Sequence, residues 1–364
     1  MKILVIQDHL RSGGTERQSV LLANACAAAG HETTLVTFRP GGALADTVAP
    51  QVARRVLQPF DTGLDWFAPG LHRAAREIAP DIILCMGRMA NCYAGGLQQA
   101  RPAAAVIATM RTGKPLPRLF RRSLQLARHV VANSFDARDL LVNRHGVPTA
   151  KISVLHNSLV FPADTPGVRD DSLRTSHGAG PGTVVLLCVA MFRPEKNQRE
   201  LVEIAAGLPA QGDWQLWLAG DGPARAECEQ LVAARGLQRR VRFLGFHRDP
   251  TPFYRAADIA VHASRSESLS NFLIEAQAHG LPAVVYQVQG IAECFIPGTT
   301  GWVVPFGDRG AFRTALQPLL ADPARRAACA APARAYARGT FDQARQVEAY
   351  LDLFRSLAQA LATP

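Results

Sequence analysis

The chain has 364 residues, of which 48% are hydrophobic, and it carries 40 Lys and Arg against 30 Asp and Glu, a formal net charge of +10. Single hydrophobic cores stop growing beyond about 250–300 residues, so two domains are expected, and the apolar fraction excludes a disordered chain. Seven scattered cysteines without a C-x-x-C pair favour reduced thiols over disulfides or a zinc site. We expect neither a signal peptide nor a bilayer-spanning helix, because no apolar run is long enough.

Apolar, β-branched segments alternate with helical patterns along the first half of the chain, as in doubly wound parallel sheets. The predicted strands are residues 3–6, 33–38, 82–85, 105–109, 129–133 and 152–156. Gly13 and Gly14 follow the first strand, where glycine lets backbone N–H groups approach a phosphate closely. The pair does not form G-x-G-x-x-G, and no acidic residue closes the second strand, which argues against a dehydrogenase.

The positive charge is concentrated in the first half of the chain. Residues 1–165 hold 19 Lys and Arg against 11 Asp and Glu, whereas the remaining residues hold 21 against 19. Around residues 116–130, apolar side chains fall on one helical face beside Arg118, Arg121 and Arg122. This pattern predicts either a basic amphipathic helix that lies on an anionic membrane or a solvated basic helix. Nucleic acid is disfavoured, because the sequence has no aromatic-interleaved basic strand or recognition helix.

The composition changes after residue 160. Residues 161–171 and 178–182 are rich in turn-forming residues and are interpreted as a linker. A second series of predicted strands follows at residues 183–189, 214–219, 241–243, 259–262, 283–286 and 301–304. The carboxyl end, residues 342–362, has a helical pattern.

Two carboxylates, Glu267 and Glu275, stand eight residues apart around a predicted helix start. Serine and asparagine are favoured N-cap residues, and the helical pattern stops before the turn at residues 280–282. A helix start presents backbone N–H groups and a positive dipole end, which suits a diphosphate without a metal. The residues at this start are therefore predicted to bind a donor nucleotide: Ser270, Asn271, Phe272 and Leu273.

This region resembles the E-x7-E motif of the retaining glycosyltransferases of the large GT4 family, and the resemblance covers nearly the whole chain. Matching motifs follow in the family's order at residues 1–6 with 12–18, then at 188–197, 218–223, 243–246, 256–259 and 301–305. The resemblance implies an α/β fold of the GT-B type, with two Rossmann-like doubly wound domains facing a central cleft. It places an N-terminal acceptor-binding domain at residues 1–165 and a C-terminal nucleotide-sugar-binding domain at residues 166–341. A C-terminal helix, residues 342–364, would cross back to the N-terminal domain.

By resemblance, Arg193 and Lys196 bind the donor diphosphate, where two cations offset its charge and the charge that grows on the leaving group. The family most often has an arginine at the position of Met191, and we expect Arg193 to take its place. Glu275 is expected to bind the ribose hydroxyls. Glu267 is expected to lie by the transferred sugar and to stabilise an oxocarbenium-like transition state.

Further positions come from the same resemblance. Phe246 and His247 follow the strand beside which the family holds the nucleotide base through backbone groups. Arg111 stands where the family usually has a histidine. Arg111 and Thr15 are the candidates for contact with the acceptor or the transferred sugar.

The resemblance thus implies retaining transfer of a hexose from a nucleotide sugar, most often a UDP sugar, to a hydroxyl of a saccharide. The acceptor would be a soluble saccharide or a lipid-linked glycan of surface polysaccharide assembly. No metal or other cofactor is expected. We expect a cytoplasmic enzyme, peripheral on the inner face of the membrane if the basic helix binds lipid. Two alternatives stay open: a same-fold epimerase or phosphorylase, and a noncatalytic nucleotide-sugar-binding subunit.

Overall fold

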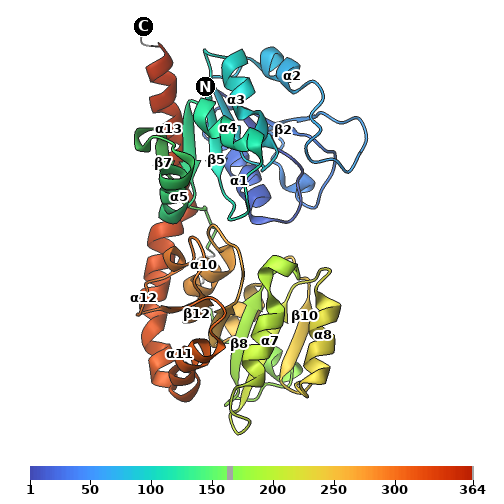
Figure 1. The fold of residues 1–364 in the computed structure, drawn as a ribbon, viewed down its shortest axis with the longest axis vertical. Coiled ribbons are helices and arrows are strands. Elements are labelled where there is room, and N and C mark those ends of the chain that lie inside the picture. The colour runs from blue at the N-terminus through green and yellow to red at the C-terminus, as the bar shows by residue number, and fades with distance from the viewer. Residues whose placement is uncertain (162–166, 363–364) are drawn as a thin grey trace. The chain divides into compact units, whose positions relative to one another are not determined.

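The computed structural model describes residues 1–161 and 167–362, and the chain divides into two compact units (Figure 1). The first unit comprises Met1–Ser158 and the carboxyl-terminal helix α13 (Gln343–Ala362). The second unit runs from Leu159 to Asp342. The first division falls at Ser158, seven residues before the predicted limit at 165, and the second falls at Asp342, one residue after the predicted limit at 341. Part of the predicted linker, residues 162–166, lies outside the described residues.

The first unit is built on a parallel sheet with the strand order β3-β2-β1-β4-β5-β6-β7. Its strands are β1 (Lys2–Gln7), β2 (Glu32–Thr37), β3 (Ala53–Val56), β4 (Ile82–Cys85), β5 (Ala105–Met110), β6 (His129–Ala132) and β7 (Ile152–Val154). The helices beside it are α1 (Gly14–Ala28), α2 (Leu71–Ile78), α3 (Ala90–Ala100), α4 (Arg118–Leu126) and α5 (Phe135–His145), with short 3-10 turns η1 (Ala45–Thr47) and η2 (Thr149–Lys151).

Both faces of this sheet are buried, as the alternation along β1 shows. Leu4 and Ile6 pack in a core with apolar residues of α2, α3, α4 and α5. Ile3 and Val5 pack in a second core with α1 and α13. Strands buried on both faces read as continuous apolar runs, which is why the sequence pattern locates them. The sequence pattern did not predict β3, because β3 is an edge strand that carries two arginines and exposes most of its residues.

The second unit has its own parallel sheet, with the order β10-β9-β8-β11-β12-β13. Its strands are β8 (Val184–Val189), β9 (Trp214–Ala219), β10 (Val241–Gly245), β11 (Ile259–His262), β12 (Ala283–Tyr286) and β13 (Gly301–Val304). Its helices are α6 (Asp171–Ser176), α7 (Gln198–Ala206), α8 (Arg225–Ala234), α9 (Thr251–Ala256), α10 (Asn271–Ala278), α11 (Arg309–Ala321) and α12 (Pro323–Phe341), with 3-10 turns η3 (Pro194–Lys196) and η4 (Ala292–Cys294).

A buried ion pair fixes the beginning of the second unit. The Arg174 side chain is 1% exposed, and its Nη1 donates to Asp258 Oδ2 at 3.0 Å and to the Ala256 carbonyl at 2.6 Å. Asp258 also accepts from the Val185 N–H at 2.8 Å. The motif at residues 256–259 thus joins α6 to the first strand of the sheet, and its role here is structural.

The basic helix α4 differs from the prediction in one respect. Its apolar residues Phe120 and Leu124 are buried in the core of the first unit, so they are not available to a bilayer. The α4 arginines (Arg118, Arg121 and Arg122) are exposed, together with Leu119, which is 62% exposed. Contact with lipid through α4 would therefore depend on charge rather than on an inserted apolar face. In the part of the chain that the structure describes, no helix combines the length and apolar character needed to cross a bilayer.

Candidate functional site

The carboxyl ends of β8 and β11 meet at the point where the strand order of the second sheet reverses, because β8 pairs with β9 on one side and β11 on the other. Ligands of doubly wound sheets bind outside the carboxyl ends of strands at such a point. The loop after β8 carries Arg193 and Lys196, and the loop after β11 carries Glu267. The strand order therefore brings together residues that stand 71 positions apart.

Glu267 is the centre of a buried polar cluster. Its Oε1 atom accepts from Lys196 Nζ at 2.6 Å and from His262 Nε2 at 2.7 Å. The Glu267 side chain is 8% exposed and that of His262 is 1% exposed, whereas that of Lys196 is 27% exposed. Among the described residues both partners meet Oε1, which leaves Oε2 for a ligand.

The pKa of Glu267 reports this environment. Burial by itself raises the pKa, because it disfavours the charged form, but the Lys196 ammonium and the His262 hydrogen bond outweigh burial and hold the pKa at about 2. Glu267 is therefore a carboxylate at any physiological pH. A buried, permanently ionised carboxylate beside a cation suits the stabilisation of positive charge on a bound substrate.

Backbone contacts hold the two loops in register. The Glu195 carbonyl accepts from the Arg265 N–H at 2.8 Å and from Ser264 Oγ at 2.9 Å. Asn197, whose φ is 55°, turns the chain into α7, and its Nδ2 donates to the Ala263 carbonyl at 3.0 Å. These bonds flank Lys196 on both sides, so its position relative to Glu267 does not depend on the ion pair alone.

Two glycines bring a neighbouring turn against the same loop. Gly220 and Gly222 have φ values of 134° and 148°, which L side chains rarely adopt. A Cβ at Gly220 would lie 2.1 Å from the Ala190 carbonyl oxygen, and one at Gly222 would lie 2.5 Å from that of Phe192. The turn at residues 220–222 thus supports the loop that carries Arg193 and Lys196.

Glu275 lies on α10, as predicted from the helical pattern, and has its own partner. Tyr254 Oη donates to Glu275 Oε2 at 2.5 Å. The Tyr254 ring stacks on His279 at 4.9 Å between centroids and on Phe272 at 6.2 Å. The tyrosine is therefore fixed, and it orients the carboxylate that we expect to bind the ribose.

The remaining donor residues occupy different environments. Ser270 is the N-cap residue of α10, but its side chain makes no capping hydrogen bond. Leu273 is fully buried, so only its backbone could contact a ligand. Asn271 begins α10 and Phe272 belongs to the aromatic stack on Tyr254. Arg193 is half-buried, and within the described residues its guanidinium makes no hydrogen bond or ion pair.

Phe246 and His247 follow β10. Phe246 is 53% exposed, which is unusual for an aromatic side chain of this size. The His247 ring packs edge-on against Phe253 at 4.7 Å between centroids, and its Nε2 lies 2.9 Å from the Leu244 carbonyl. Both residues are exposed, and only the His247 ring has a packing partner among these contacts.

The glycine pair of the first unit begins α1, with Gly13 at the N-cap and Gly14 and Thr15 in the first turn. Neither glycine has a positive φ. A Cβ at Gly13 would lie 2.4 Å from Glu16 Oε2, so the side chain of Glu16 folds back over the helix start. An anion at this position would have to displace that carboxylate.

Arg111 is engaged within the first unit. Its Nη1 donates to Asn157 Oδ1 at 2.7 Å, and its Nη2 donates to the hydroxyl of Tyr350 on α13. Tyr350 is fully buried. These contacts tie β5 to α13 and favour a structural role for Arg111 over the predicted contact with sugar or acceptor.

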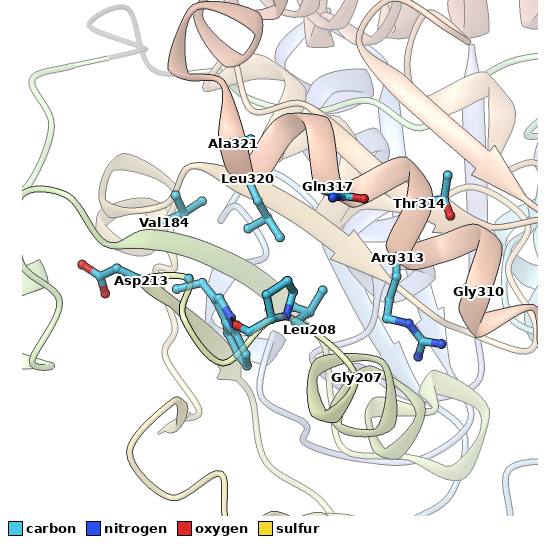
Figure 2. Close-up of a pocket in the computed structure, with 13 residues that line it drawn as sticks. Val184, Gly207, Leu208, Asp213, Gly310, Arg313, Thr314, Gln317, Leu320 and Ala321 are labelled. Atoms are coloured by element: carbon cyan, nitrogen blue, oxygen red, sulfur yellow. Dashed lines mark hydrogen bonds between the residues drawn. The ribbon is translucent and has the colours of Figure 1, made fainter.

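A cavity of about 580 Å³ lies elsewhere in the second unit, between the segment at residues 207–214 and α11. Figure 2 shows Asp213 and Arg313 on opposite sides of Leu208 in this cavity. Its lining includes Val184 and Trp214, the first residues of β8 and β9, so it lies at the amino ends of the strands and away from Glu267. Within the described residues, no group of three or more His, Cys, Asp or Glu side chains could hold a metal ion.

Two family profiles match the sequence. Glycosyl transferases group 1 covers residues 170–336, which include the Glu267 cluster, and Glycosyltransferase Family 4 covers residues 12–159. The chain belongs to the group 1 glycosyltransferases. The predicted family is thus confirmed.

This glycosyltransferase is 28% identical over 239 residues to the lipopolysaccharide core biosynthesis glycosyltransferase LpsE of Rhizobium meliloti, across 59% of this chain and 69% of LpsE. It is 33% identical over 209 residues to the alpha-D-kanosaminyltransferase of Streptomyces kanamyceticus, across 56% of this chain and 54% of that enzyme. The second match therefore spans only about half of the relative's length.

Among solved structures, Alr3699/HepE of Anabaena in complex with UDP and glucose matches with a TM-score of 0.81 at 21% identity, over 98% of this chain and 100% of that chain. Together with the two parallel sheets, this likeness confirms the predicted GT-B fold class of two Rossmann-like domains. No sequence motif pointed to His262 or Tyr254 as site residues. A histidine that ends the otherwise apolar strand β11 was the available signal for the first.

Proposed function

We propose that this glycosyltransferase transfers a hexose from a UDP sugar to a saccharide hydroxyl with retention of anomeric configuration. The observation that carries the proposal is the buried Lys196–Glu267–His262 cluster at the switch point of the second sheet. It combines a cation for the diphosphate with a carboxylate for the sugar, and these charges are opposite to those that the reaction develops on each group.

The donor diphosphate would lie against Lys196 and Arg193. An ammonium has three N–H donors, and the contact with Glu267 uses one of them, so Lys196 can bind phosphate without leaving the carboxylate. The Arg193 guanidinium is accessible for the same purpose. Both cations would stabilise the negative charge that grows on the leaving diphosphate as the bond from C1 to its oxygen breaks.

Glu267 would stabilise the positive charge on the sugar in the same step. Because its carboxylate is held by Lys196 and His262, no reorganisation is needed when the charge appears. The acceptor hydroxyl would attack C1 on the face that the diphosphate leaves. Its proton would pass to an oxygen of the departing phosphate, which closes the proton balance without a protein base.

Support for the substrates comes from relatives. The HepE structure contains UDP and glucose, and LpsE is named for lipopolysaccharide core biosynthesis. We therefore favour a UDP hexose as donor and a surface glycan, soluble or lipid-linked, as acceptor. Docking on an anionic cytoplasmic leaflet through the exposed α4 arginines is part of the proposal for a lipid-linked acceptor.

Titration calorimetry with a panel of nucleotide sugars tests the donor, and proton NMR of the product tests retention through the anomeric coupling. We expect one UDP sugar to bind tightly and the product to have the same anomeric configuration as the donor. The enzyme should also keep its full activity in excess chelator. If chelator abolishes activity and magnesium or manganese restores it, the proposal of a metal-independent reaction is wrong. Conversion of the donor without acceptor would favour the epimerase, and binding without any turnover would favour the noncatalytic subunit.

A further inference from the structure

The segment between β3 and α2, residues 57–70, exposes an unusual amount of aromatic surface. We name it the Trp66 loop. Trp66 is 55% exposed, Phe60 is 67% exposed and Phe67 is 39% exposed, and Leu64 is also exposed. The Trp66 and Phe67 rings meet edge to face, with centroids 6.1 Å apart. Contiguous exposed apolar side chains of this kind mark interaction sites.

The backbone of the Trp66 loop is held from inside by Gln58, which is 1% exposed. Gln58 Nε2 donates to the Leu64 carbonyl at 2.9 Å and to the Phe67 carbonyl at 2.6 Å, and its Oε1 accepts from Thr62 Oγ1 at 2.8 Å. Tyr93 of α3 donates to the Trp66 carbonyl at 2.5 Å. The rings are thus carried by an ordered loop, and these contacts do not use the rings.

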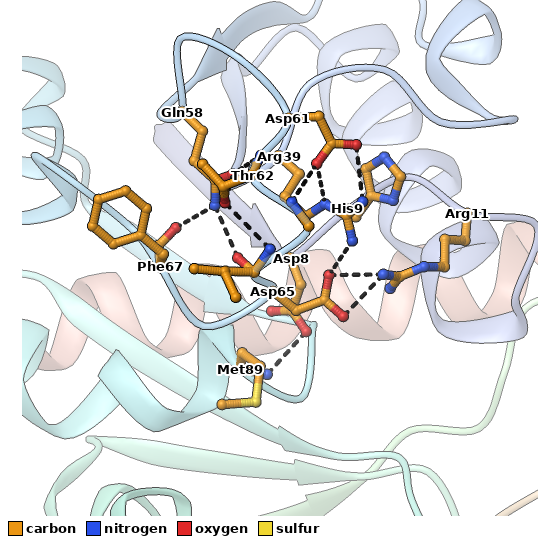
Figure 3. Close-up of polar contacts among 12 residues, drawn as sticks. Asp8, His9, Arg11, Arg39, Gln58, Asp61, Thr62, Asp65, Phe67 and Met89 are labelled. Atoms are coloured by element: carbon orange, nitrogen blue, oxygen red, sulfur yellow. Dashed lines mark hydrogen bonds and ion pairs between the residues drawn. The ribbon is translucent and has the colours of Figure 1, made fainter.

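Ion pairs join the same loop to the carboxyl ends of β1 and β2 (Figure 3). Arg39 binds Asp61 at 2.7 Å and Asp65 at 2.8 Å, and Arg11 binds both oxygens of Asp65 at 2.7 and 2.9 Å. Asp61 is 45% exposed and Asp65 is 35% exposed at the side chain. Charged groups that can bind hydroxyls therefore lie in the same loop as the exposed rings.

This edge of the sheet is where the first unit would receive a ligand. The strand order reverses between β1 and β4, and Asp8, just after β1, accepts from the N–H groups of Met89 and Ala90 at the start of α3. Gln7 is 2% exposed, and its Oε1 has no hydrogen-bond partner among the described residues. A Cβ at Gly87 would meet both Gln7 and Asp8, so the backbone there leaves no room for a side chain. This end of the sheet is thus the switch point at which doubly wound sheets bind their ligands.

We infer that the Trp66 loop is the acceptor platform of the first unit: a saccharide ring stacks on Trp66, and its hydroxyls bind Asp61, Asp65 and Arg11. The inference rests on the proposed function, which supplies the class of substrate. A sugar ring has a face of C–H groups that packs on an aromatic ring, and hydroxyls around its rim that form hydrogen bonds with charged side chains. The loop offers both kinds of surface.

The charges favour a saccharide over a membrane at this loop. Asp61 and Asp65 offset the charges of Arg39 and Arg11, so this cluster offers no net positive charge that would attract an anionic leaflet. Insertion of the rings into a bilayer would also remove water from two carboxylates and two guanidinium groups, which is costly even for paired charges. A saccharide brings neither cost.

Saturation-transfer NMR tests the inference, with UDP-saturated protein and a panel of glucose, galactose, mannose and N-acetylglucosamine oligosaccharides of two to four units. We expect transfer from at least one oligosaccharide and about tenfold weaker binding in Trp66→Ala, the magnitude of one lost aromatic contact. Leu119→Ala is the matched control, because it also removes an exposed apolar side chain from the first unit and should bind as wild type. Thermal unfolding checks that each variant folds.

The outcomes separate the inference from the proposed function. Unchanged saccharide affinity in Trp66→Ala, or no transfer from any oligosaccharide while UDP still binds in calorimetry, would overturn the platform alone. Absence of UDP binding as well would overturn the proposed function. The wild-type protein could instead sediment with phosphatidylcholine or phosphatidylglycerol vesicles. If Trp66→Ala abolishes this sedimentation and leaves saccharide affinity unchanged, the Trp66 loop is a membrane contact.

Discussion

Replacing the buried carboxylate by its amide, Glu267→Gln, should reduce the loss of stability that the second unit suffers in acid. In the native protein Glu267 has a pKa of about 2 against an ordinary value of 4.5. The unfolded chain therefore binds a proton more readily than the folded chain in this range. Stability that comes from the ionised carboxylate is fully present above about pH 4.5 and is lost as the pH falls through about 2.

The magnitude follows from the two pKa values. Each pKa unit is about 1.4 kcal/mol, so the folded site favours the carboxylate by roughly 3 kcal/mol near neutral pH. At about pH 3 the unfolded side chain is almost fully protonated while the folded one is still mostly ionised, and roughly 2 kcal/mol of the contribution has been lost. Glu267 is 8% exposed, so little solvent screening reduces this figure.

Urea unfolding followed by tryptophan fluorescence measures the effect. Of the four tryptophans, Trp214, Trp217 and Trp302 lie in the second unit, so a Trp66→Phe background makes the signal specific to that unit. Between about pH 7 and pH 3, the background protein should lose roughly 2 kcal/mol more unfolding free energy than the same protein with Glu267→Gln. Equal losses in the two proteins would refute the assignment of a depressed pKa to Glu267.

The remaining predictions concern binding and turnover. Lys196→Ala and Arg193→Ala should each weaken UDP binding in calorimetry by about 1.5 to 3 kcal/mol, the range for hydrogen bonds to charged groups. The control Arg199→Ala, which removes an exposed cation of α7, should leave UDP binding unchanged. A variant of Lys196 or Arg193 that binds UDP with wild-type affinity would exclude that residue from the diphosphate site. Glu267→Gln should lower turnover far more than donor affinity, because the Glu267 carboxylate acts on the transition state. Glu275→Gln should instead raise the dissociation constant of the donor. Equal effects of the two changes on donor affinity, with turnover intact, would contradict these separate roles. Changing the α4 arginines to glutamate should abolish salt-sensitive sedimentation with phosphatidylglycerol vesicles and leave UDP binding unchanged. The charge-matched control changes three exposed arginines of the second unit to glutamate. If the wild-type protein does not sediment with these vesicles, the α4 arginines are solvated surface only.

The fold class and most of the strands could be predicted from the amino-acid pattern alone. Residues 82–85, 214–219, 259–262, 283–286 and 301–304 were predicted with the limits that the structure shows, because strands covered on both faces are continuous apolar runs. The glutamate spacing and the ordered motifs also identified the family, which the profiles confirm. The roles of the individual site residues stay predictions.

The contacts between site side chains, in contrast, became known only from the folded chain. Lys196 and Glu267 come together because β8 and β11 are neighbours in the sheet, an order that no local pattern encodes. His262 and Tyr254 meet Glu267 and Glu275 only because the loop after β11 folds back on its strand and α9 lies beside α10, which the spacing of these residues does not reveal. Local patterns depend on which face of an element is buried, whereas these contacts depend on strand order and loop packing, and both of those are set by the whole domain.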